Sequence, residues 1–130
     1  MSKPQILIVD DEESLRLLYA TDLTASGYQV DVAAGVREAI AKIENKKYDL
    51  ILLDIEMPEM SGMEALELLR QKTPTSKLLI NSAYNIYKSD FQSWLADDYL
   101  VKTSDLLVLK DTIERVLKCP SIPLRNANKN

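Results

Sequence analysis

Short apolar runs alternate along the chain with longer amphipathic segments. The run Ile6–Val9 is followed directly by acidic residues and predicts a strand buried on both faces of a sheet. Asp49–Leu53 is a second run of this type. Three shorter segments complete a predicted set of five strands, at Gln29–Ala33, Lys77–Asn81 and Tyr99–Val101.

Between the predicted strands, apolar residues recur at helical spacing. The clearest helix runs from Glu13 to Ser26, with acids in its first turn and Gly27 just past its end. Its predicted inward stripe is Leu15, Leu18, Tyr19 and Leu23. Four more helices are predicted: one around Val36–Ile43, one from a Ser61 cap to about Thr73, an aromatic one with Tyr87, Phe91, Trp94 and Leu95, and one from Ser104 or Asp105 to about Lys118.

Five strands alternating with five helices predict a doubly wound α/β domain. Right-handed crossovers would place helices on both faces of a five-stranded parallel sheet, in three αβα layers with the flavodoxin-like strand order 2-1-3-4-5. We expect one domain at residues 1–118. Residues 119–130 contain two prolines and three asparagines, which predicts a flexible tail.

Composition narrows the range of functions. The 130 residues carry a net charge of -4, whereas a protein that binds nucleic acid directly is usually basic, so nucleic acid is not an expected direct partner. The single cysteine, Cys119, cannot form an internal disulfide, and no leader or long apolar span is seen near Met1. We therefore expect a cytoplasmic protein without a membrane anchor. Histidine is absent, so any chemistry must use carboxylates, hydroxyls and amines.

The candidate reactive residues all stand at the carboxyl ends of predicted strands. Asp10 and Asp11 follow the first strand, Asp54 the third and Ser82 the fourth, and Lys102 ends the fifth. In an open parallel sheet these ends share one edge, so the three carboxylates would meet in one pocket. Three carboxylates so close together repel one another and raise one another's pKa unless a cation lies among them. Oxygen ligands favour Mg²⁺ or Mn²⁺ over zinc.

The same set of groups suits phosphoryl transfer. Asp54 is an anionic nucleophile, and Lys102 and Ser82 offer a positive charge and a hydroxyl to phosphoryl oxygens. These residues, with the flanking motifs Val9-Asp10-Asp11, Leu53-Asp54 and Ser82-Ala83, resemble in order and spacing the receiver family of response regulators, from residue 5 to about 118.

The resemblance implies a stand-alone receiver domain that acts as a switch and is not a turnover enzyme. A histidine kinase or phosphotransfer protein would phosphorylate Asp54, which would change binding to a downstream protein, with no DNA-binding segment in the chain. The resemblance also implies individual roles: Asp11, Asp54 and the Glu56 carbonyl as metal ligands, Asp10 acting through water, Ser82, Lys102 and the Ala83 amide on phosphoryl oxygens, Tyr99 as a switch aromatic, and Glu56 and Tyr84 as tuners of phosphoryl lifetime.

The chain departs from the family pattern at two places. Thr103 stands where the family has proline, so we expect a trans Lys102–Thr103 bond with a rearranged loop, or a cis bond only if the pocket enforces it. The stretch from Ser82 to Lys102 is short and lacks a glycine before Ala96, which predicts a truncated or shifted fourth helix.

Other interpretations remain open at this point. Taken singly, the acids after the first strand suit a helix dipole, Ser82 a helix cap, Lys102 a solvated surface residue, and Tyr99 half-buried packing. The Asp54-Ile55-Glu56 motif also resembles that of aspartate-nucleophile phosphatases. A third possibility is an interaction module that keeps the fold without being phosphorylated.

Overall fold

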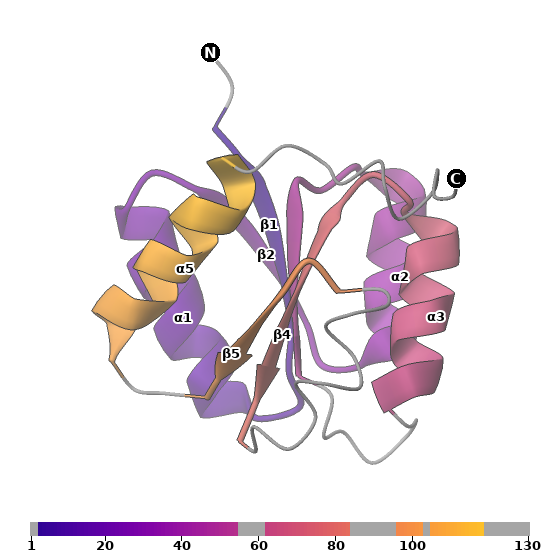
Figure 1. Ribbon diagram of the computed structural model, residues 1–130, viewed down its shortest axis with the longest axis horizontal. Coiled ribbons are helices and arrows are strands. Elements are labelled where there is room, and N and C mark those ends of the chain that lie inside the picture. The colour runs from indigo at the N-terminus through magenta and orange to yellow at the C-terminus, as the bar shows by residue number, and fades with distance from the viewer. Residues whose placement is uncertain (1–2, 55–61, 84–95, 103–104, 119–130) are drawn as a thin grey trace.

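The computed structural model of the protein describes residues 3–54, 62–83, 96–102 and 105–118. Within them, five parallel strands form one sheet in the order β2-β1-β3-β4-β5 (Figure 1). The predicted fold class and strand order are thereby confirmed. The strands are β1 (Gln5–Val9), β2 (Gln29–Ala33), β3 (Leu50–Asp54), β4 (Lys77–Ser82) and β5 (Asp98–Val101).

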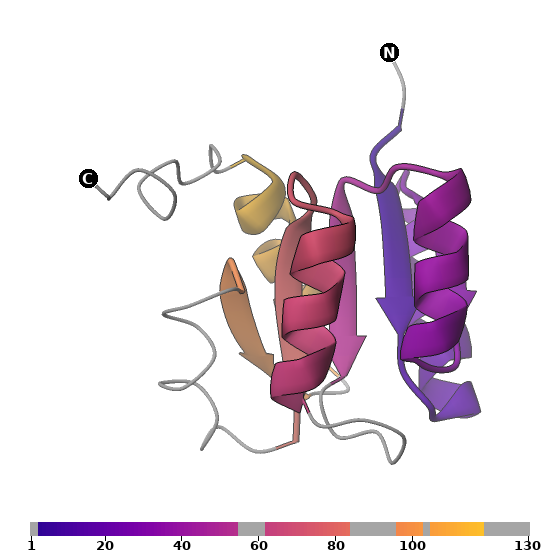
Figure 2. The ribbon, with the colours of Figure 1, turned by 90° about the vertical axis from the view of Figure 1, so that its right-hand side faces the viewer.

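Among the described elements, two helices cover each face of the sheet. In Figure 2, α2 and α3 lie in front of the strands and α1 and α5 lie behind them, which gives the predicted three layers. The predicted aromatic helix falls at 84–95, outside the described residues. The described helices are α1 (Glu13–Ala25), α2 (Val36–Asn45), α3 (Gly62–Lys72) and α5 (Leu106–Lys118).

The core is divided into two layers by the sheet. Alternate residues of each buried strand face opposite sides, so Ile6 and Ile8 pack beneath α1 and α5, whereas Leu7 and Val9 pack against α2 and α3. All five residues of β3 are buried. This explains why the central strands read as continuous apolar runs in the sequence.

The inward stripe of α1 is narrower than predicted. Tyr19 and Leu23 are fully buried and Leu15 is partly buried, but the prediction for Leu18 is wrong, since its side chain is 40% exposed. Consecutive helical residues are turned by about 100°, so Tyr19 and Leu18 cannot both face the middle of one contact.

Helix ends follow the predicted local signals. Gly27 adopts a positive φ of 104°, the conformation that glycine supplies at a helix C-terminus. At the start of α5, Asp105 Oδ1 accepts a hydrogen bond from the Leu107 N–H at 3.1 Å. Ser104, the alternative cap, lies outside the described residues. None of the helices in the described ranges has the length and apolar character needed to span a bilayer.

An ionic clamp joins α3 to the starts of β4 and β5. Arg70 forms an ion pair with Asp97 at 3.1 Å and donates to the Ser76 carbonyl at 2.9 Å. The same Asp97 carboxylate oxygen accepts the Leu78 N–H at 2.7 Å. The entry to β5 is therefore fixed to the neighbouring strand and helix, which helps to set the position of Lys102 at the other end of β5.

Candidate functional site

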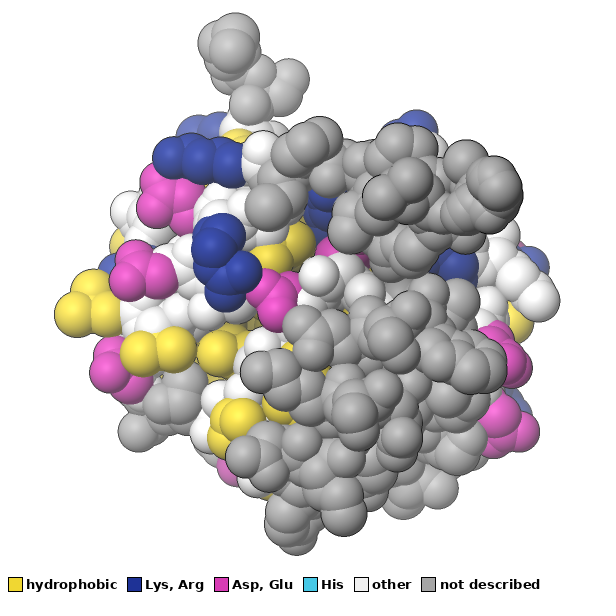
Figure 3. Space-filling model, viewed as in Figure 1, with side chains coloured by type: hydrophobic (Ala, Val, Ile, Leu, Met, Phe, Trp, Pro, Cys, Tyr) yellow, Lys and Arg dark blue, Asp and Glu magenta, His cyan; other side chains and the backbone are white. Residues whose placement is uncertain are grey.

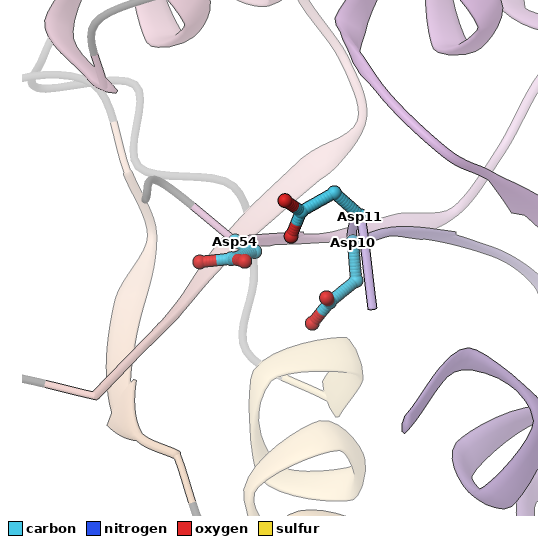
Figure 4. A group of neighbouring side chains, drawn as sticks. All are labelled: Asp10, Asp11 and Asp54. Carbon is cyan, nitrogen blue, oxygen red and sulfur yellow. The ribbon is translucent and has the colours of Figure 1, made fainter. Parts of the chain in front are cut away.

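Three carboxylates meet at the carboxyl ends of β1 and β3. These strands are neighbours, with Val9 paired to Leu53, so Asp10 and Asp54 emerge side by side. One oxygen each from Asp10, Asp11 and Asp54 lies within 4.8 Å of the others, and Figure 4 shows the three side chains gathered around a common space. Asp10 and Asp54 are 1% and 2% exposed, whereas Asp11 is exposed. The predicted cluster thus forms with one side open to solvent.

Local hydrogen bonds hold Asp10 in a buried position. Its Oδ1 accepts the Glu12 N–H at 2.8 Å, and its carbonyl accepts a hydrogen bond from Arg16 at 2.7 Å. Burial raises the pKa of Asp10, the Glu12 hydrogen bond opposes this rise, and the nearby Asp54 charge adds to it. The pKa of Asp10 stays raised although Lys102 opposes the rise, so a further positive charge in the cluster would favour the ionised form.

Lys102 brings one positive charge to these acids. Its side chain extends from the end of β5 across β4, and its Nζ lies 3.2 Å from both Asp10 Oδ2 and Asp54 Oδ2. The Lys102 N–H donates to the Ser82 carbonyl at 2.6 Å, which fixes the lysine backbone on β4. Burial lowers the pKa of Lys102, but the two carboxylates outweigh it and raise that pKa, so the lysine is an ammonium at neutral pH.

The charges and donor atoms of the cluster fit a divalent cation. Three ionised carboxylates and one ammonium leave two negative charges in a largely buried place, and a divalent ion would neutralise them. The available ligands are oxygens only, as Mg²⁺ prefers. Exposed Asp11 would leave a route for the ion and for the waters that Mg²⁺ retains.

The remaining predicted residues are only partly described. Ser82 is the last residue of β4 and is fully buried, and Ala83 follows it at the surface. Tyr99 is 7% exposed and packs in the core layer that contains Ile80, so it is more deeply buried than the half-buried alternative. Glu56, Tyr84 and Thr103 lie outside the described residues, and so does the Lys102–Thr103 bond.

Two residues near the cluster were missed by sequence reasoning. Arg16 contacts the Asp10 carbonyl, and nothing in its surroundings in the sequence signals this. Asn81 is buried at the end of β4, beside Asp54 in the strand register. A signal did exist for Asn81, because it is a polar amide at the end of the apolar run Leu78-Leu79-Ile80.

The described surface shows no single-sign patch on the face drawn in Figure 3. Lysine and arginine side chains are interspersed with acidic ones, and apolar side chains lie among them over the α5 side. This agrees with the acidic net charge of -4. Nothing in this view resembles the basic footprint of a nucleic-acid interface.

Comparison with known proteins points to one family. The model of the response regulator receiver domain matches residues 6–114. Response regulator ArlR of Staphylococcus epidermidis is 36% identical over 114 residues, which cover 87% of this chain and 52% of ArlR. The chain therefore spans about half the length of the curated relatives it matches.

Solved structures agree with this result. Response regulator TrrA of Thermotoga maritima, in complex with Mg²⁺-BeF, is 40% identical and superposes with a TM-score of 0.79, covering 87% of this chain and 98% of TrrA. A structure of TrrA in complex with the histidine kinase ThkA matches equally well, with 40% identity and a TM-score of 0.79 over 88% of this chain and 99% of TrrA.

Proposed function

Because this chain belongs to the response-regulator receiver family, we propose that it is a phosphorylation switch with Asp54 as phosphoacceptor. The observation that carries the proposal is the contact of Lys102 with Asp54 and Asp10, beside exposed Asp11. Since the chain contains no histidine, the phosphoryl donor would be a separate histidine kinase or phosphotransfer protein. The complex of TrrA with ThkA supports this class of partner.

The proposed reaction transfers a phosphoryl group from phosphohistidine to a carboxylate. An Asp54 oxygen attacks phosphorus, the phosphorus–nitrogen bond breaks, and the imidazole leaves with the bonding electron pair. Lys102, as an ammonium, would face the phosphoryl oxygens, assisted by the Ser82 hydroxyl and the Ala83 N–H. Burial of Asp54 limits competing water at the nucleophile.

Mg²⁺, or Mn²⁺ in its place, would offset the negative charge that gathers when two anions approach each other. We assign Asp11, Asp54 and the Glu56 carbonyl as ligands, with Asp10 acting through water. The donor set at Asp10, Asp11 and Asp54 supports this assignment, as does the Mg²⁺-BeF complex of TrrA. Glu56 and Tyr84 are proposed to tune the lifetime of the phosphoryl group.

Output would follow from a change of surface at β5 and α5. Tyr99 is the proposed switch residue, since it lies on β5 three residues before Lys102 and is buried in the core. Val101 at the end of β5 and Leu107 and Val108 in the first turn of α5 are exposed apolar residues, and they are suited to contact a downstream protein. We expect the switch to act in the cytoplasm, with residues 1–118 as the receiver domain.

Intact-mass analysis tests the proposal. With acetyl phosphate and Mg²⁺, the wild-type protein should gain one phosphoryl group, and Asp54→Ala and Asp54→Asn should gain none. Asp111→Asn, which removes an exposed acid on α5, is the matched control and should gain the group as the wild type does. A wild type that stays unmodified, or Asp54 variants modified as well as it is, would refute the assignment.

Two further measurements, phosphate release from a phosphomonoester and partner binding, separate the two alternatives. An aspartate-nucleophile phosphatase would release many phosphates per protein from a phosphomonoester, whereas the proposed switch makes and loses a single acyl phosphate. An interaction module without phosphorylation would show no mass change and would bind its partner equally well with and without the phosphodonor.

A further inference from the structure

Asn81 is a polar residue buried in the most apolar part of the sheet. It is 1% exposed and pairs with Asp54 on β3 and with Leu100 on β5. The residues before it in β4, Leu78 to Ile80, are all fully buried apolar side chains. A buried amide costs free energy unless its donors and acceptor are satisfied.

The hydrogen bonds of Asn81 are incomplete. Its Nδ2 lies 3.5 Å from the Tyr19 hydroxyl, at the outer limit of a hydrogen bond. Its Oδ1 is buried and finds no hydrogen-bond partner within the described part of the chain. A buried acceptor left open in this way calls for an explanation, such as a partner present only in another state of the protein.

The position of Asn81 relates it to Lys102. Leu79 and Leu100 belong to the core layer beneath α1 and α5, so strand alternation turns Asn81 toward that layer. Asp54 faces the same way, since it follows Leu52 by two residues. The Lys102 side chain crosses β4 on its way to Asp54 and therefore passes the end of β4 where Asn81 lies.

Lys102 and a divalent cation compete for the same oxygens. Both carboxylates that Lys102 contacts belong to the three-acid cluster, so a cation bound there would draw on those oxygens and repel the ammonium. An ammonium has three N–H donors and needs acceptors wherever it moves. Asn81 Oδ1, on the strand next to β5, is a buried acceptor without a hydrogen-bond partner among the described residues.

We propose that Asn81 is a positioning residue for Lys102, whose ammonium donates to Asn81 Oδ1 once a divalent cation occupies the Asp10–Asp11–Asp54 cluster. The inference rests on the proposed function and deepens it. Asn81 would stabilise the cation-loaded state by giving Lys102 an alternative to the two carboxylates. The long contact with Tyr19 would leave the amide free to take part in this exchange.

A double-mutant cycle measures this role. Asn81→Leu keeps the branched shape and the number of heavy atoms but removes the acceptor, so it should weaken Mg²⁺ binding several-fold, because Lys102 then holds the carboxylates more strongly. In a Lys102→Met background no ammonium competes, and Asn81→Leu should leave the Mg²⁺ dissociation constant unchanged. Titration calorimetry with Mg²⁺ alone gives this constant for the four proteins without any activity assay.

Two further variants protect the interpretation. Thr112→Val removes another buried polar group, a hydroxyl that donates to the Val108 carbonyl in α5, and should not alter Mg²⁺ affinity. Asn81→Ser, whose hydroxyl is too short to replace the amide oxygen, should behave as Asn81→Leu does and carries the test if the leucine variant does not fold. Urea unfolding of each protein establishes that it is folded.

The outcomes separate this inference from the proposed function. A wild type that binds no Mg²⁺ and takes no phosphoryl group would overturn the proposed function itself. A wild type that does both, with Asn81→Leu and Asn81→Ser of unchanged Mg²⁺ affinity, would overturn only the role of Asn81. An equal loss of affinity with and without Lys102 would also overturn it, since the effect would then be independent of the lysine.

Discussion

Replacing Lys102 by methionine removes the positive charge that contacts the carboxylates of Asp10 and Asp54, while keeping most of the apolar stem. Lys102 Nζ lies 3.2 Å from oxygens of Asp10 and Asp54, both at most 2% exposed, and its own side chain is 19% exposed. Removing one partner of a buried ion pair typically costs about 3–5 kcal/mol. Two features reduce this cost, because Asp10 can take up a proton and water can enter beside exposed Asp11. Without divalent ions we therefore expect the free energy of unfolding to fall by about 2–3 kcal/mol.

Mg²⁺ should reverse most of this loss. In the methionine variant the ion no longer has to displace an ammonium, so it should bind more tightly than in the wild type. Mg²⁺ stabilises both proteins, so at saturating Mg²⁺ the difference between them closes by RT ln of the ratio of their dissociation constants, which is about 2 kcal/mol for binding about 30-fold tighter in the variant. The gap between variant and wild type should therefore narrow to under about 1 kcal/mol at saturating Mg²⁺.

Urea unfolding near neutral pH, with EDTA or with Mg²⁺, provides the assay. The control is Lys110→Met, whose ammonium lies 3.6 Å from Asp22 in a more exposed ion pair, so it should cost less than about 1 kcal/mol and respond to Mg²⁺ as the wild type does. The reasoning fails if Lys102→Met is as stable as the wild type in EDTA. It also fails if the two lysine variants show the same loss in free energy of unfolding.

Two further predictions concern pH and the clamp on β5. Because the folded state raises the pKa of Asp10 above its ordinary value of 3.8, that state binds the proton more tightly than the unfolded chain, so metal-free stability should rise as pH falls from neutral through the raised pKa. Asp10→Asn, or saturating Mg²⁺, should abolish this rise in urea titrations, and its persistence in the variant would assign it to another group. Arg70→Met should cost about 1–2 kcal/mol, since it leaves Asp97 buried, whereas Lys72→Met, in a 3.8 Å pair with exposed Glu44, should change stability little. Equal losses for these two variants would contradict the clamp.

The fold was predictable because its strongest signals are local. Buried strands such as Ile6–Val9 read as apolar runs, and Gly27 marks the end of a helix by the one conformation it adopts easily. Leu18 shows the limit of this reasoning. Hydrophobicity alone does not tell which of two adjacent apolar residues, here Leu18 and Tyr19, will face the core. The facing elements decide this, and their placement is a property of the whole chain.

The acidic cluster was predictable for a different reason. Strand order alone brings Asp10 and Asp54 to neighbouring ends of one sheet edge. The contact of Lys102 with Asp10 could not be predicted from the sequence, because it depends on how far the lysine side chain reaches across β4. The burial of Asn81 and the contact of Arg16 with a backbone carbonyl depend equally on tertiary packing.

The short outer strand β5 also affects how the protein behaves when it is concentrated. An outer strand can accept a strand from another molecule, and charged residues at its ends discourage this because they would have to give up water. β5 has only four residues, begins at Asp98, which pairs with Arg115 at 2.6 Å, and runs into Lys102. A strand from a neighbouring molecule could therefore pair with only a short segment that has charged residues at both ends, which disfavours growth of the sheet into aggregates.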